Sequence, residues 1–357
     1  MVDMKKVVTY PQMGDYNVPI YYLLTHILHC EVKKPLKISD RTVELGNKYS
    51  PTFVCMPFKY TLGTFLESLE DGANVLIQLG GGCRYGYYYA LQQEIIKEQG
   101  YTFEFINLVT EGKSDIKKII KEFRKIDSHF SILKSAYYLF ITTKMIKYMD
   151  KIDHQIRKNI GFEQKKGEHL KLKQEMLTRF EQNKGYFHLF FTYLSYKRKF
   201  KKIKKNKENC LKVGIIGELY TIMEPFANYD LEIMLSQYGI EVTRFTNATY
   251  LLFQKKKRVK KYLKKVGKFS KNRLGADALD NVGRLVYLGE KGYDGAIHIK
   301  SSFCTPEIGV MPILRRVSEE YKIPLLFFSF DTNTSKVGIE TRIEAFYDMI
   351  EMRKQNE

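Results

Sequence analysis

Five cysteines are the side chains best suited to chemistry in this chain of 357 residues, because the sequence holds neither a paired-histidine metal motif nor a serine-nucleophile motif. Cys55, Cys83 and Cys304 each stand just before the predicted start of a helix. A helix N-terminus favours the thiolate, which is the form of cysteine that binds iron or zinc. Lys59 and Arg84 add positive charge beside the first two cysteines. These three cysteines are therefore candidate metal ligands.

The spacing between the three candidates matches no local motif such as CxxC, so chance burial of three cysteines near loop ends is the alternative interpretation. Three protein ligands would leave one position of a tetrahedral metal open, which suits substrate binding better than a purely structural site. Cys30 and Cys210 each precede a predicted strand and are interpreted as small buried or incidental thiols. An odd number of cysteines in a reducing compartment predicts no disulfide.

A glycine run and a group of tyrosines surround Cys83. Gly80, Gly81 and Gly82 lack the spacing of a dinucleotide-binding or Walker loop, so we expect a tight turn rather than a phosphate cradle. Four tyrosines follow between positions 85 and 89. Packing against the core is their expected role, and a phenol that lines a pocket is the alternative.

The elements that must position the cysteines form two similar series of apolar strands separated by helices. In the N-terminal part, the predicted strands are residues 6–10, 30–33, 52–56, 74–79 and 103–108, and in the C-terminal part they are residues 212–217, 241–245, 295–299 and 325–330. Near-continuous apolar strands that alternate with helices are typical of a parallel sheet covered by helices. Ligands of such sheets bind at the carboxyl edge, so Cys55, Cys83 and Cys304, each predicted to stand where a strand gives way to a helix, are expected to converge there.

We therefore predict an α/β protein with two Rossmann-like (flavodoxin-like) parallel-sheet lobes and a helical insertion between them. Residues 1–113 are predicted to form the N-terminal lobe that carries Cys55 and Cys83. Residues 114–210, where long helical patterns lack proline, are predicted to form the helical insertion with a basic linker. Residues 211–357 are predicted to form the C-terminal lobe that carries Cys304.

Positive charge is concentrated in two basic runs. The chain holds 59 Lys and Arg against 40 Asp and Glu, and residues 197–207 and 255–265 each contain eight basic side chains and no acid. Without a recognised motif these runs do not predict nucleic-acid binding, so a solvated surface is expected, with an anionic small molecule or an acidic protein as alternative partners. No apolar window is long enough for a membrane span and no signal peptide is recognisable, which predicts a cytoplasmic protein without membrane attachment.

Seven sequence blocks stand out: RTVELG at 41–46, SPTFVCMPFK at 50–59, GCRYGYY at 82–88, GELY at 217–220, EPFAN at 224–228, FCTPEI at 303–308 and TRIEAF at 341–346. Together these blocks resemble the activase-related, D-component-like branch of the 2-hydroxyacyl-CoA dehydratase family. By position, the resemblance implies that Cys55, Cys83 and Cys304 hold an oxygen-sensitive [4Fe-4S] cluster.

The resemblance also implies a role in an anaerobic multi-protein system. An ATP-dependent activator protein would inject one electron, the cluster-bearing component would pass it to a CoA-thioester substrate, and radical dehydration by this lyase system would follow. A homo- or heterodimer is expected, and no catalytic residue is assigned. The alternatives are a low-potential electron relay or ATP-dependent reductase component without dehydratase activity, and a non-catalytic, metal-stabilised interaction protein.

Overall fold

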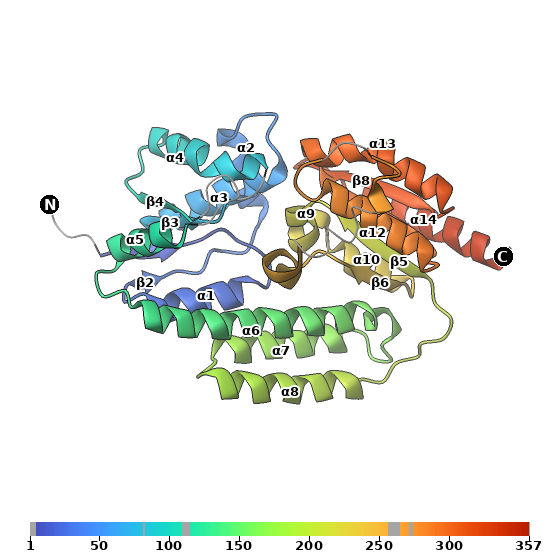
Figure 1. The fold of residues 1–357 in the computed structure, drawn as a ribbon, viewed down its shortest axis with the longest axis horizontal. Helices are drawn as coiled ribbons and strands as arrows, with labels where there is room; N and C mark the ends of the chain where they lie inside the picture. Colours follow the sequence, from blue (N-terminus) through green and yellow to red (C-terminus); the bar gives the residue numbers. More distant parts are fainter. Residues whose placement is uncertain (1–4, 81–82, 109–114, 256–264, 271–273, 357) are drawn as a thin grey trace. The chain divides into compact units, whose positions relative to one another are not determined.

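The computed structural model describes residues 5–80, 83–108, 115–255, 265–270 and 274–356 (Figure 1). The chain divides into two compact units. The first unit comprises residues 1–145 and 180–189, and the second comprises residues 146–179 and 190–357. The predicted division into three parts at residues 113 and 210 stays a prediction.

The first unit is built on a sheet of four parallel strands in the order β2-β1-β3-β4. The strands are β1 (Val7–Thr9), β2 (Glu31–Val32), β3 (Val75–Gln78) and β4 (Glu104–Asn107). The helices of this part of the chain are α1 (Asn17–Ile27), α2 (Asp40–Tyr49), α3 (Met56–Glu70), the 3-10 helix η1 (Arg84–Tyr87), α4 (Tyr88–Glu98) and α5 (Ile116–Ile126).

Helices cover both faces of this sheet, as the apolar strands require. Val75 and Ile77 of β3 pack in one core cluster with residues of α1 and α5. Leu76, which points to the opposite face, packs in another cluster with residues of α3 and α4. Successive side chains of a strand point to opposite faces, so a continuously buried strand such as β3 needs a helical layer on each side.

The predicted strand at residues 52–56 is wrong. Residues 52–54 form turns and a bend, and α3 already begins at Met56, inside the predicted strand. Pro57 explains the difference, because proline fixes a helical φ and is favoured in the first turn of a helix. Phe53, whose aromatic side chain favours a buried strand, is instead exposed.

The second unit contains a sheet with the same arrangement, again four parallel strands, in the order β6-β5-β7-β8. Its strands are β5 (Lys212–Gly217), β6 (Glu241–Arg244), β7 (Gly295–Ser301) and β8 (Leu325–Phe330). Its surrounding helices are α9 (Leu219–Met223), η3 (Phe226–Asn228), α10 (Leu231–Gln237), the π-helix η4 (Tyr250–Gln254), α12 (Ala278–Glu290), α13 (Thr305–Glu320) and α14 (Lys336–Gln355).

Long helices occupy the predicted insertion. They are α6 (Ile132–Arg157), α7 (Glu168–Glu181) and α8 (Tyr186–Lys202), with the short 3-10 helix η2 (Ile160–Phe162) after α6. Each of the three long helices contributes residues to both compact units. Most of the second basic run, residues 256–264, lies outside the described residues.

The α/β fold class with two parallel-sheet lobes is confirmed by these two sheets. Across the part of the chain that the structure describes, no helix is both long enough and apolar enough to cross a membrane.

Candidate functional site

Cys55 is the N-cap residue of α3, and it is half-buried. Its Sγ atom contacts the hydroxyl of Tyr88, the first residue of α4. Because α3 directly precedes β3 and a short turn joins them, the start of α3 lies toward the carboxyl edge of the sheet. Cys55 thus lies at the expected edge of the sheet because it begins a helix, and not because it ends a strand.

Close packing of α2 against α3 fixes the start of α3. A Cβ atom on Gly46 of α2 would lie 2.2 Å from the carbonyl oxygen of Lys59, and one on Gly63 of α3 would lie 2.0 Å from that of Thr42. These two glycines allow the helix backbones to touch. In addition, the Thr42 hydroxyl donates a hydrogen bond of 2.5 Å to Glu67 Oε2. The RTVELG block at 41–46 therefore supports the helix that begins beside Cys55.

Cys83 is the N-cap residue of η1 and is exposed. Its Sγ atom accepts a long contact of 3.5 Å from the backbone N–H of Tyr85. Gly81 and Gly82, part of the predicted tight turn, lie outside the described residues. Cys83 follows β3, so it too belongs to the carboxyl edge of the first sheet.

Tyr88 links the two cysteines electrostatically. Burial is the main cause that raises the pKa of its phenol, and the charges of Cys55 and Cys83 raise it further. The Cys55 sulfur contacts the Tyr88 hydroxyl, and Cys83 caps η1, the short helix that leads directly into Tyr88. Two thiols at helix starts form a donor set that fits a thiolate-ligated iron centre.

Cys304 is the N-cap residue of α13 and follows β7, at the carboxyl edge of the second sheet. Its backbone N–H donates to Ser301 O at 3.0 Å, and its carbonyl accepts from the Ile308 N–H at 2.9 Å. Cys304 belongs to the second unit, whereas Cys55 and Cys83 belong to the first. Among the described residues, no three or more His, Cys, Asp or Glu side chains gather in a metal-binding group. The convergence of all three sulfur atoms stays a prediction.

Cys30 and Cys210 lie at the opposite end of their strands. Cys30 directly precedes β2, and Cys210 stands two positions before β5. Burial raises the pKa of the Cys30 thiol, which disfavours the thiolate that a metal would need.

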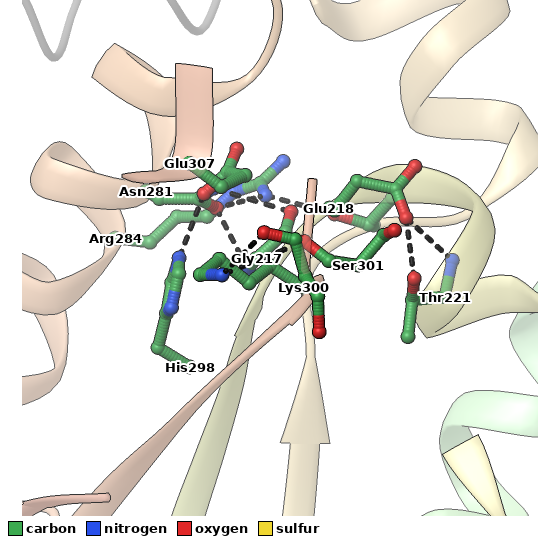
Figure 2. Close-up of polar contacts among 11 residues, drawn as sticks. Gly217, Glu218, Thr221, Asn281, Arg284, His298, Lys300, Ser301 and Glu307 are labelled. Carbon is green, nitrogen blue, oxygen red and sulfur yellow. Dashed lines mark hydrogen bonds and ion pairs between the residues drawn. The ribbon is translucent and has the colours of Figure 1, made fainter. Parts of the chain in front are cut away.

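A buried polar network surrounds the start of α13 (Figure 2). The carboxylate of Glu307, in the first turn of α13, accepts hydrogen bonds from Asn281 Nδ2 at 3.1 and 3.0 Å. His298 Nε2 lies 2.7 Å from Glu307 Oε2. All three side chains are almost completely buried. Buried polar groups need such partners, so the network holds the first turn of α13, and with it Cys304, in one position.

Asn281 also joins α12 to the end of β5. Its Oδ1 accepts from the Gly217 N–H at 3.1 Å, and its Nδ2 lies 3.1 Å from Gly217 O. Gly217 has a φ of 134° and approaches β7 so closely that a Cβ atom would lie 1.8 Å from the carbonyl oxygen of Ile299. Only glycine tolerates this conformation and this contact.

Arg284 carries a buried positive charge into the network. Its Nη1 donates to Asn281 Oδ1 at 2.9 Å and to Thr246 Oγ1 at 2.8 Å. The guanidinium carbon lies 4.6 Å from the ring centroid of Tyr250, whose hydroxyl in turn donates to Asp280. A cation placed over an aromatic ring is stabilised there, so the Tyr250 ring offsets part of the cost of burying the Arg284 guanidinium.

Two further charged residues stand at the same edge of the second sheet. Burial lowers the pKa of Lys300, and the nearby Cys304 and Glu307 oppose that effect. Burial raises the pKa of Glu218, the N-cap residue of α9, and Glu307 raises it further. Figure 2 shows Glu218, Lys300 and Glu307 together above the ends of the strands. The carboxyl edge of this sheet thus combines a thiol, an amine and two carboxyl groups.

Sequence patterns alone do not single out Asn281, Arg284, His298 and Lys300. A signal is present for two of them, because His298 and Lys300 stand at alternate positions of a fully buried strand whose other residues before Ser301 are apolar. A buried strand that carries two polar side chains on one face indicates a polar partner on that face. No comparable signal marks Asn281 and Arg284. These residues stand three positions apart in a helix, a spacing that exposed pairs of residues also show.

One part of the chain matches a known protein family. Residues 244–350 match the family model of the 2-hydroxyglutaryl-CoA dehydratase D-component. This segment contains Cys304 and most of the buried network, but neither Cys55 nor Cys83. A comparison with curated proteins found no match. Over residues 244–350 the chain is therefore similar to the D-component of 2-hydroxyglutaryl-CoA dehydratase, which confirms the family resemblance found in the sequence.

Proposed function

We propose that this protein is the iron–sulfur component of a 2-hydroxyacyl-CoA dehydratase-type system, with Cys55, Cys83 and Cys304 as ligands of a [4Fe-4S] cluster. The match of residues 244–350 to the D-component family supports a component of such a system. The observation that carries the proposal is the pair of helix-capping thiols, Cys83 and Cys55, the second of which contacts the Tyr88 hydroxyl. Cys304, also a helix N-cap, lies within the matched segment.

When bound, the cluster supplies a one-electron redox centre and an open iron position. The residues of the chain then have distinct tasks. The three helix starts favour thiolates, and Arg84 adds positive charge next to Cys83. The Tyr88 hydroxyl is placed to donate a hydrogen bond to the Cys55 sulfur, and hydrogen bonds to ligand sulfurs tune the potential of such a centre.

The buried network in the second unit positions the third ligand. Glu307, held by Asn281 and His298, fixes the turn of α13 that begins at Cys304. Lys300 places a cation within electrostatic range of Cys304. This cation would balance part of the negative charge that a thiolate brings to a buried site.

The proposed partners follow from the family. An ATP-dependent activator protein would supply the electron, a CoA thioester would be the substrate, and a homo- or heterodimer is the expected assembly. The system would be a lyase.

The test is an anaerobic assay with reconstituted protein, an ATP-dependent activator and a panel of 2-hydroxyacyl-CoA thioesters. We expect ATP-dependent reduction of the protein, followed by the unsaturated acyl-CoA product, and loss of both in Cys304→Ser. Reduction without dehydration across the panel would favour the electron relay or reductase. A protein that holds no iron would contradict both functions and favour a non-catalytic, interacting protein.

A further inference from the structure

One face of helix α8 joins an apolar hollow to a row of cations. The helix buries Tyr193, Tyr196 and Phe200 on its inner side. Its outer side carries a hollow of about 400 Å³, here called the α8 hollow, which is lined by Phe191, Leu194, Ser195, Arg198, Lys199 and Lys202. Phe191, at one end, is 64% exposed. Spacings of three and four residues place these side chains on one face of the helix, shown as the light-green α8 in Figure 1.

In the part of the chain that the structure describes, no acidic side chain lies within ion-pair distance of Arg198, Lys199 or Lys202. Lys199 instead places its Nζ 4.4 Å from the ring centroid of Tyr196. Residues 197–207 contain no acid of their own. Lys207, at the end of this run, does form an ion pair, with Glu241 at 2.6 Å. Three cations without an acidic neighbour among the described residues thus line the α8 hollow, where opposite charge would be attracted.

We propose that the α8 hollow docks an acidic segment of a partner protein. An apolar side chain of that segment would fill the hollow against Phe191 and Leu194, and its carboxylates would face Arg198, Lys199 and Lys202. Apolar anchors flanked by charged contacts are the usual composition of a protein interface.

The composition of this face of α8 favours an acidic protein over two other kinds of anionic partner, a lipid bilayer and a single-stranded nucleic acid. A helix that lies on a bilayer presents a wide apolar face to the lipid along its length. The large apolar side chains that α8 exposes are Phe187 and Phe191, both near its start, and the side chains exposed near its end are basic. Single-stranded nucleic acid is held by several aromatic rings spread between cations, whereas the exposed rings of α8, Phe187 and Phe191, both precede the cations of the hollow.

The experiment measures binding of a labelled acidic helical peptide to the full-length protein by fluorescence anisotropy. The peptide carries Leu flanked by Glu at helical spacings of three and four, and a scrambled peptide has the same composition. The test variant is R198E/K199E/K202E. The matched control is K165E/K166E/K171E, which makes the same change of charge at exposed positions of the same unit. A third variant, Phe191→Ser, tests the apolar anchor.

We expect the patterned peptide to bind about tenfold or more weakly to R198E/K199E/K202E and several-fold more weakly to Phe191→Ser, with little change in the control. Equal losses in the test and control variants, or equal binding of the scrambled peptide, would overturn the proposal in favour of unspecific attraction. Absence of peptide binding would overturn it as well. Tighter binding to phosphatidylserine vesicles or single-stranded DNA, abolished by R198E/K199E/K202E, would reassign the surface. The measurement needs no cluster, so it is independent of the proposed function.

Discussion

At the scale of single residues, the buried carboxylate of Glu307 depends on few partners. Asn281 donates to both of its oxygens, and His298 lies against one of them. Removing one partner of a buried charge leaves that charge unpaired, which costs more free energy than the hydrogen bond itself contributed. Asn281 is therefore the most sensitive position of the network, because it also holds Gly217 and Arg284.

Asn281→Ala should lower the free energy of unfolding by about 3 kcal/mol, since it removes donors from Glu307 and an acceptor from Arg284. Urea denaturation followed by circular dichroism measures this change. Asn333→Ala, at an exposed position, is the control and should alter stability by less than about 0.5 kcal/mol. Equal stabilities of the two variants would show that the network does not hold the start of α13.

A site residue can be predicted from the sequence only where its residue type alone indicates its chemistry. Cysteine is a conspicuous ligand, so Cys55, Cys83 and Cys304 can be selected by residue type and by their places beside predicted helix starts. The roles of Asn281 and Tyr88 depend on contacts between distant segments, such as Asn281 with Gly217 and Tyr88 with Cys55. No local pattern encodes those contacts.

At the scale of elements, strands are easier to predict than helix starts. β5 and β8 occupy the predicted residues 212–217 and 325–330, because they are long apolar runs with clear boundaries. Residues 52–56 combine Thr, Phe and Val and favour a strand by composition, yet Pro57 stands there in the first turn of α3. A short apolar run next to a proline is therefore ambiguous, and tertiary packing decides its structure.

Gly46→Ala tests the close contact between α2 and α3. The added Cβ would press against the backbone of Lys59, which cannot move without displacing α3. We expect a loss of about 2–4 kcal/mol in the free energy of unfolding, although alanine favours helices. Gly309→Ala in α13 is the matched control, since nothing lies within 4 Å of its added Cβ. That variant should be as stable as the wild type or about 0.5–1 kcal/mol more stable, and equal effects at both positions would contradict the packing argument.

The C-cap of α5 predicts a pH dependence of stability. Burial acts to raise the pKa of Asp127, but hydrogen bonds from the His29 side chain and from the backbone N–H groups of His29 and His129 outweigh it and hold the pKa below its ordinary value. A carboxyl group with a lowered folded-state pKa stabilises the fold above its unfolded pKa of about 3.9. That stabilisation is lost as the pH falls through the folded-state pKa.

Asp127→Asn should therefore be less stable than the wild type at neutral pH, and the difference should shrink as the pH falls below about 4. Urea denaturation at a series of pH values measures this difference. Glu98→Gln, at an exposed end of α4, is the control and should show no comparable trend. A difference that stayed constant down to about pH 2 would contradict the assigned hydrogen bonds.

At the scale of the whole molecule, the two sheets repeat one plan. In each, the second strand along the chain is outermost, next to the first, and the third and fourth follow. The alternation of apolar strands and helices predicts a parallel sheet covered by helices in both lobes, but it does not predict this strand order. The sequence does not predict how charge is distributed among neighbours, for example that Lys207 pairs with Glu241 while Arg198 remains available at the α8 hollow.

The most direct test of the central claim is the iron and acid-labile sulfide content of anaerobically reconstituted protein, combined with its EPR spectrum after reduction. The wild type and the five single Cys→Ser variants are measured side by side. We predict equal amounts of iron and sulfide and a cluster signal in the wild type, Cys30→Ser and Cys210→Ser, and loss of both in Cys55→Ser, Cys83→Ser and Cys304→Ser. Wild-type iron content in Cys304→Ser, or a wild type that binds no iron, would contradict the account.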